Sequence, residues 1–317
     1  MNAFTRYLAK ITLAGSIALS MAAAAAHAED KVVRIGFQKY GTLILLKTKG
    51  LLEEKLKPQG YTVEWTEFPA GPQLLEALNV GSIDFGTTGE APPIFAQAAG
   101  APLIYVGYEP PAPEAEAILV PKESPLKTVA DLKGKKVALN KGSNVHYLLV
   151  KALEKAGLAY TDIEVNFLPP ADARAAFEKQ AVDAWVIWEP FLAAAEAATG
   201  ARQLANGSGV VDNHEFYLAS RDFLDAHPDV VDTIVASLGE VDTWINANRG
   251  DVAEQFSPAL GIPVDVLEVA VERRTYGVKP ITPEVVAAQQ KIADVFHQLG
   301  LIPAAIRIAD AVKKPQS

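Results

Sequence analysis

The sequence predicts an α/β protein with two similar lobes, and three features of the chain support this prediction. Short apolar runs typical of strands alternate with helical patterns, as in folds whose strands are mostly parallel. The same order of strand, loop and helix returns about a hundred residues later. Strand-like segments at 114–121 and 216–219 join the halves, so we expect the chain to leave the first lobe, build the second and return.

The first lobe is expected to alternate strands and helices over residues 32–99. Apolar alternation marks the strands, and a Pro-Ala-Gly-Pro loop at 69–72 separates the second strand from its helix. In chain order we predict a strand at 32–37, a helix at 43–56, a strand at 61–68, a helix through 74–78, a strand at 83–86 and a helix that opens with 87–90 and runs to 99.

The second lobe repeats this order. Individual residues correspond as well: Val63-Glu64 matches Ile163-Glu164, and Pro69 matches Pro169. Common ancestry and chance likeness of two β-α-β-α-β units remain open, but both give two similar lobes. In chain order we predict a strand at 136–139, a helix at 145–156, a strand at 163–167, a helix at 173–178, a strand at 182–188 and a helix begun by 189–190.

The N-terminus is typical of an export signal. Residues 1–10 carry two basic residues and no acid, an apolar run follows at 11–26, and Ala26-His27-Ala28 is a small-x-small cleavage pattern. The alternative, a transmembrane anchor, is disfavoured because the run is short and only polar sequence follows it. We expect a soluble periplasmic protein that begins near Glu29. The expected division is a signal peptide at 1–28, the first part of lobe 1 at 29–116, lobe 2 at 117–217, and a return to lobe 1 with C-terminal helices at 218–317.

Composition and motifs argue against several classes of function. The net charge of −9 disfavours nucleic acid and anionic membranes as partners, because both are polyanions. The chain has no cysteine, which excludes disulfides, thiolate metal sites, iron–sulfur clusters and cysteine nucleophiles. It has no G-x-S-x-G, no phosphate loop, no H-E-x-x-H and no G-x-G-x-x-G. We therefore expect no catalytic residues, no metal and no cofactor.

Ligands of open parallel sheets lie beyond the carboxyl ends of the strands, at helix N-termini. If the two lobes face one another, five loops line one cleft between them. These loops contain Gln38, Gly71, Thr88, Asn144 and Trp188.

Hydroxyls and glycines stand at several of the expected helix starts, at Gly41-Thr42, Thr88-Gly89 and Ser143-Asn144. Helix capping is the alternative for any one of them taken alone. Several such starts around one cleft would aim free N–H groups and positive dipole ends at one place, which suits a small oxyanion. Neutral donors would also let the anion leave again, since no buried salt bridge has to break.

Charged and aromatic residues beside the cleft leave more than one interpretation. Trp188 ends a strand and is the better of two tryptophans for covering an apolar group. Glu90 and Glu189 would repel an anion as buried acids, so they would accept from backbone N–H groups, form ion pairs, or meet a ligand ammonium. Arg273 and Arg274 could pair with an anion, but arginines near a helix end are usually solvated.

Several long motifs follow one another along the chain, at 67–72, 77–84, 89–100, 106–111, 128–134, 170–177 and 182–190. In this order they resemble the periplasmic aliphatic sulfonate-binding proteins of ABC transporters. Close relatives of that family take up taurine, nitrate and thiamine precursors. The resemblance covers essentially the whole chain after the signal peptide and is looser after Leu224.

The resemblance implies a two-lobed periplasmic binding protein of type II, with two crossover strands as the hinge. It implies a monomer that captures a small organic sulfonate for sulfur acquisition and delivers it to a membrane permease with its ATPase. Tyr40 and Trp188 would meet the alkyl part. The expected ligand-binding residues are Gln38, Tyr40, Gly41, Thr42, Gly71, Thr88, Gly89, Glu90, Ser143, Asn144, Trp188 and Glu189.

Other functions remain as alternatives to a sulfonate receptor. The ligand could be taurine, nitrate or another small anion of the same superfamily. An enzyme acting on a small anion is a different class, but the enzymes similar to this fold rely on a cysteine-rich segment or a cysteine nucleophile, and this chain has neither. A scaffold or sensor subunit would not need helix starts opened by glycine around one cleft.

Overall fold

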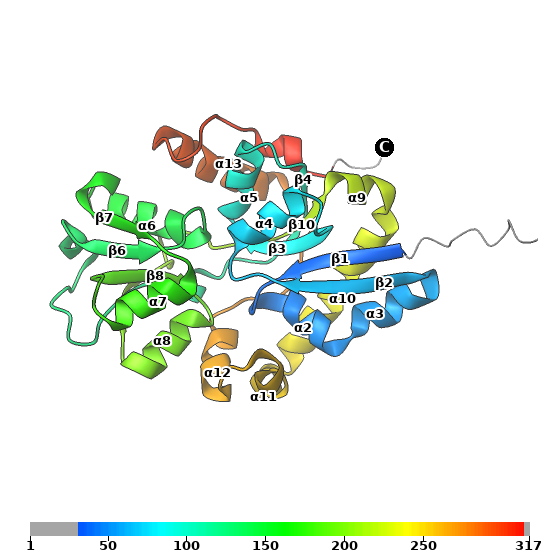
Figure 1. Cartoon of the computed structure of the whole chain (residues 1–317), viewed down its shortest axis with the longest axis horizontal. Helices are drawn as coiled ribbons and strands as arrows, with labels where there is room; N and C mark the ends of the chain where they lie inside the picture. The colour runs from blue at the N-terminus through cyan, green and yellow to red at the C-terminus, as the bar shows by residue number, and fades with distance from the viewer. Residues whose placement is uncertain (1–30, 314–317) are drawn as a thin grey trace, which may run out of the picture.

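The computed structural model describes residues 31–313, which form two lobes, each built on a five-stranded sheet (Figure 1). This confirms the predicted α/β architecture. The predicted signal peptide and its cleavage site lie outside the described residues. Within 31–313, no helix combines the length and apolar character that crossing a bilayer requires.

The first sheet has the strand order β2-β1-β3-β10-β4. β1 runs parallel to β2 and β3, and β10 is antiparallel to both β3 and β4. The strands of this sheet are β1 (Lys31–Phe37), β2 (Tyr61–Glu67), β3 (Phe85–Gly89), β4 (Leu103–Tyr108) and β10 (Glu215–Ser220).

The second sheet repeats this pattern with the order β7-β6-β8-β5-β9. β6 is parallel to β7 and β8, and β5 is antiparallel to β8 and β9. Its strands are β5 (Glu116–Val120), β6 (Lys136–Leu139), β7 (Glu164–Phe167), β8 (Ala184–Trp188) and β9 (Arg202–Asn206).

Two connections cross between the lobes, one from β4 to β5 and one from β9 to β10. Each connection leads directly into the one strand that is antiparallel to its neighbours in the sheet: β5 in the second lobe and β10 in the first. The chain thus leaves the first lobe once and returns once, as predicted. Two short connections of this kind are a natural hinge.

The helices flank the two sheets, and Figure 1 shows α6, α7 and α8 on the second lobe, with α12 lying next to α8 and α11 next to α12. The first-lobe helices before the crossing are α2 (Gly41–Lys49), α3 (Leu51–Leu56), α4 (Gly71–Asn79) and α5 (Pro92–Ala98). Those of the second lobe are α6 (Asn144–Lys155), α7 (Pro170–Glu178) and α8 (Phe191–Thr199). After the return come α9 (Arg221–Ala226), α10 (Pro228–Ala247), α11 (Arg249–Leu260), α12 (Val264–Glu272) and α13 (Pro283–Gln298).

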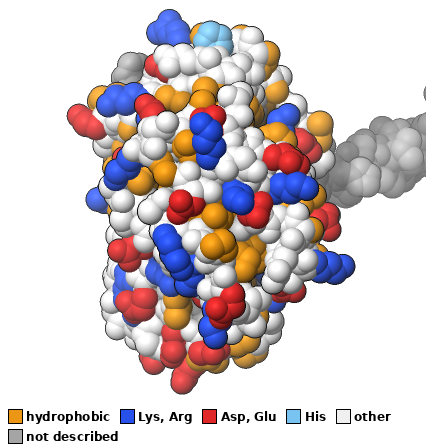
Figure 2. All heavy atoms as spheres, turned by 90° about the vertical axis from the view of Figure 1, so that its left-hand side faces the viewer, with side chains coloured by type: hydrophobic (Ala, Val, Ile, Leu, Met, Phe, Trp, Pro, Cys, Tyr) orange, Lys and Arg blue, Asp and Glu red, His pale blue; other side chains and the backbone are white. Residues whose placement is uncertain are grey.

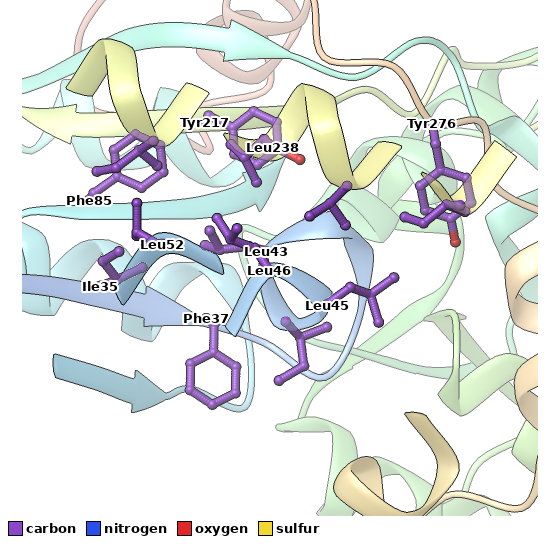
Figure 3. Close-up of a cluster of buried hydrophobic side chains, with 14 of the residues drawn as sticks. Ile35, Phe37, Leu43, Leu45, Leu46, Leu52, Phe85, Tyr217, Leu238 and Tyr276 are labelled. Carbon is purple, nitrogen blue, oxygen red and sulfur yellow. The ribbon is translucent and has the colours of Figure 1, made fainter. Parts of the chain in front are cut away.

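The first sheet is covered by apolar side chains on both faces. Along β10, Tyr217 belongs to one apolar cluster while Phe216 and Leu218 belong to another, because successive strand residues point to opposite faces. Figure 3 shows the first cluster, in which Phe85 of β3 packs with Leu52 of α3 and residues of α2 and α10. This packing fixes the strand ends from which the loops of the cleft project.

Two details of the predicted elements are wrong. The predicted helix at 43–56 is two helices, because Gly50 takes a left-handed conformation (φ 65°) that ends α2. Thr87 to Gly89 do not open a helix: they belong to β3, where they pair with β10, and α5 begins only at Pro92. The strands β4 and β9 were also not predicted.

The visible surface of the second lobe carries both signs of charge. Figure 2 shows basic and acidic side chains interspersed, with hydrophobic side chains in small areas between them. This face therefore gives no indication of a large apolar interface.

Candidate functional site

The two lobes touch where their strands end. Gly89 ends β3 in the first lobe and lies against Asn144, the first residue of α6 in the second. A Cβ atom added to Gly89 would lie 2.8 Å from Asn144 Cγ, so only glycine allows this approach. The structure therefore brings together predicted site residues that are 55 positions apart in the chain.

The lobes also meet at two places away from this contact. On one side, Arg273, which follows α12, donates hydrogen bonds of 2.7 Å from Nη1 to both Glu189 and Glu196 of the second lobe. On another, the ring of His146 on α6 lies 6.2 Å from that of Phe95 and 5.7 Å from that of Phe296, both on first-lobe helices. These contacts describe a closed arrangement of the two lobes.

The loop after β1 is held by side-chain hydrogen bonds. Gln38 is 3% exposed and donates from Nε2 to the Thr87 carbonyl at 3.1 Å and to the Tyr40 hydroxyl at 3.2 Å. Gly41 has a left-handed φ of 73°, and a Cβ atom there would lie 2.5 Å from Glu215 Oε1. Both the conformation and the lack of space therefore require glycine at the start of α2.

Three helices begin at this junction without a side-chain cap: α2, α4 and α6. None has an acidic residue in its first turn. The alternative of helix capping is wrong for these hydroxyls, because none of them accepts a hydrogen bond from an N–H group at these helix starts. They donate instead: Thr42 to Asp242 (2.5 Å), Thr88 to the Gly89 carbonyl (3.0 Å) and Ser143 to the Asn140 carbonyl (2.7 Å). Pro72 has no N–H and the His146 N–H donates to the Ser143 carbonyl, so the first N–H groups of α2 and those of Gly71 and Asn144 are left for water or a ligand.

Buried carboxyl groups surround this junction. Glu116 is fully buried and accepts from Asn144 Nδ2 at 2.5 Å, while Glu90 is 2% exposed and accepts from the backbone N–H of His214 at 3.1 Å. Burial raises the pKa of Glu90 to about 8 and the pKa of Glu116 well above its usual range. Burial therefore favours the protonated form of both groups, and protonation removes the repulsion that a buried carboxylate would exert on an anion.

Glu189 takes two of the roles that the sequence left open. Its Oε2 accepts from the backbone N–H of Ala193 at 3.0 Å, and its Oε1 accepts from Arg273.

Trp188 is 5% exposed and packs edge-on against Phe191, with 6.1 Å between the ring centroids. Gly71 begins α4 beside Thr88, whose Cβ would lie 3.0 Å from a Cβ added to Gly71.

Sequence reasoning missed several polar residues of this region. Glu116 could have been noticed, because it is an acid at the head of the apolar run 116–120. Glu215 and Asn213 carry no such signal; their roles arise from contacts with Thr87, Arg274 and Asn144. The expectation of a solvated side chain is wrong for Arg274, which is 9% exposed and pairs with Glu215.

No metal centre emerges from the part of the chain that the structure describes. Residues 31–313 contain no group of three or more His, Asp or Glu side chains placed to hold a metal ion. His146 is buried and shares a 2.7 Å hydrogen bond with the Tyr160 hydroxyl. Burial lowers its pKa to about 4, so the ring is neutral at neutral pH.

Two sheets, two crossings and loops that meet at the strand ends define the class: a two-lobed protein with the periplasmic binding protein fold. The model of the NMT1-like family matches residues 26–257, and the chain belongs to this family. The structure is similar to that of the alkanesulfonate-binding protein SsuA from Xanthomonas axonopodis pv. citri bound to MOPS, with a TM-score of 0.85 and 44% identity over 91% of this chain and 100% of that one.

Two relatives from Escherichia coli extend this comparison. The periplasmic aliphatic sulphonate binding protein SsuA has a TM-score of 0.82 and 45% identity over 90% of this chain and 93% of that one. A taurine-binding periplasmic protein is 25% identical over 241 residues, 72% of each chain. These relatives are binding proteins, which supports the expectation that the chain is not an enzyme.

Proposed function

We propose that this protein captures an aliphatic sulfonate between its lobes in the periplasm and delivers it to the permease and ATPase of an ABC importer. The observation that supports this most strongly is the set of uncapped helix N-termini at the lobe junction. Similarity to two sulfonate-binding proteins at 44% and 45% identity supports the substrate class. We propose that the receptor acts as a monomer.

The chemistry of a sulfonate suits this junction. The group carries one negative charge and three oxygens that only accept hydrogen bonds, so each protein group that bonds to these oxygens has to donate. The N–H groups of α2, α4 and α6 are such donors, and their helix dipoles add positive potential. The proposed contact residues are those predicted from the sequence: Gln38, Tyr40, Gly41, Thr42, Gly71, Thr88, Gly89, Glu90, Ser143, Asn144, Trp188 and Glu189.

Closure would couple binding to transport. A ligand stabilises the closed form only through contacts that the open form lacks. The Gly89–Asn144 approach and the Arg273 ion pairs join the two lobes, so they would form when the lobes close. The bound sulfonate would then lie under both lobes and away from solvent.

Tryptophan fluorescence of the ligand-free protein from Glu29 onward, titrated with small anions, tests this proposal. We expect saturable binding of alkanesulfonates and weaker or no response to nitrate, sulfate and bicarbonate. Saturation by taurine or nitrate alone would replace the proposed substrate. If no ligand changes the fluorescence, and calorimetry also detects no binding, the proposed function is contradicted.

A further inference from the structure

A small apolar cavity lies beside the proposed anion site. Its walls come from three first-lobe helices: Ile44 and Leu45 of α2, Phe256 and Leu260 of α11, and Leu267 and Val271 of α12. Toward the junction of the lobes it is lined by Tyr40 and Gly41 of the first lobe and by Glu189 and Pro190 of the second.

The cavity is small and continuous with the core of the first lobe. Figure 3 shows Leu45 and Tyr276, two lining residues, at the end of the core cluster that lies away from Ile35 and Phe85. The cavity volume of about 40 Å³ holds about three water-sized groups. The part of this space between the aliphatic side chains suits a short alkyl group better than water, because water among those side chains would lack polar partners.

Arg274 supplies the polar end of this cavity. Its guanidinium pairs with Glu215 and lies 4.8 Å from the centre of the Tyr40 ring. Its side chain is 9% exposed, and its Nε is buried with no hydrogen-bond partner among the described residues. A buried, charged donor without an acceptor is costly, so the site is arranged for an acceptor that the protein itself does not provide.

We propose that this cavity binds the alkyl tail of the sulfonate, while Arg274 Nε donates a hydrogen bond to one sulfonate oxygen at the end next to Tyr40. The inference rests on the proposed function and makes it more specific, because it selects sulfonates with a short, unbranched tail. The other two oxygens remain for the helix N-termini. Tyr40 keeps the role expected for it beside the tail, whereas Trp188 does not line this cavity.

Calorimetric titration with linear sulfonates from methanesulfonate to hexanesulfonate tests the tail site. Each buried methylene should strengthen binding about fourfold, for about three carbons, after which affinity should stop rising. Ala270→Leu places a larger side chain in the cavity and should abolish the gain with chain length. Leu267→Ala enlarges the cavity and should move the best ligand toward longer tails, and it provides the test if Ala270→Leu does not fold.

Matched variants separate the parts of this inference. Ala176→Leu makes the same change on α7, away from the cavity, and should keep the wild-type dependence on tail length. Arg274→Lys keeps a charge beside Glu215 but loses Nε, and should weaken binding about tenfold or more at every length. An unchanged length profile in both Ala270→Leu and Leu267→Ala, or unchanged affinity in Arg274→Lys, would overturn the inference. Failure of the wild-type protein to bind any sulfonate would instead overturn the proposed function.

Discussion

Arg273 offers the sharpest test of lobe closure, because it ties the two lobes together from outside the proposed anion site. It follows α12, whose Leu267 and Val271 pack in the first-lobe core, and it pairs with Glu189 and Glu196 of the second lobe. Separating the lobes would break both ion pairs. Arg273→Gln should therefore destabilise the closed form and weaken ligand binding without removing a ligand contact.

The structure sets the size of this effect. Glu189 is 1% exposed and Arg273 is 22% exposed, so the pair lies between a buried ion pair, worth about 3–5 kcal/mol when broken, and an exposed one, worth about 1 kcal/mol or less. We expect a loss of about 2 kcal/mol, which is about a 30-fold weaker affinity. Most of it should be in the dissociation rate, because the lost contacts hold the closed complex together.

Stopped-flow fluorescence and calorimetry with a bound sulfonate measure both quantities. Combining Arg273→Gln with Glu196→Gln in a double-mutant cycle should show coupling, since the two side chains interact directly. Arg174→Gln is the matched control, because Arg174 pairs with Glu178 within α7 and spans no lobe boundary. Wild-type dissociation rates in Arg273→Gln, with thermal unfolding unchanged, would refute the closure argument.

Two further variants test the junction itself. Gly89→Ala adds a Cβ atom 2.8 Å from Asn144 Cγ, so it should hinder closure and weaken binding at least about tenfold; calorimetry showing wild-type affinity would contradict this. The second variant tests Glu90, whose pKa is about 8 in the folded protein against an ordinary value of 4.5. The protonated carboxyl therefore contributes its full share to folding stability below pH 4.5. This contribution is lost as the pH rises through 8, by up to about 1.4 kcal/mol per pH unit. Glu90→Gln should reduce the fall in thermal stability between pH 5 and 8, whereas Glu54→Gln, at an exposed position, should not. Equal dependence of thermal stability on pH in the wild type and in Glu90→Gln would refute the raised pKa of Glu90.

The fold was predictable where local pattern decides structure. The alternation of strands and helices and its repetition predict two lobes, and the strand 216–219 predicts the return, which β10 confirms. The helix start predicted at Thr87 and Thr88 was wrong because threonine and glycine are also common at helix starts. Their strand conformation depends on pairing with β10, about 130 residues further along the chain, which no local pattern reveals.

The polar residues of the site were likewise predictable only in part. Loop positions such as Gln38, Gly89 and Asn144 could be placed because parallel strands direct their carboxyl ends to one edge. The burial of Arg274 could not be predicted from the sequence, because its partners Glu215 and Tyr40 come from β10 and from the loop after β1. The same holds for Glu116, whose raised pKa follows from burial that only the packed lobes create.

Anomalous X-ray diffraction from crystals grown with propane-1-sulfonate tests the central claim most directly. The sequence has no cysteine and only two methionines, Met1 and Met21, so a chain that starts at Glu29 contains no sulfur beyond an initiator methionine. An ordered sulfur peak therefore marks the ligand. We predict that peak between the N-termini of α2 and α6, with the propyl group toward Leu267. A sulfur peak outside the junction of the lobes would contradict the account.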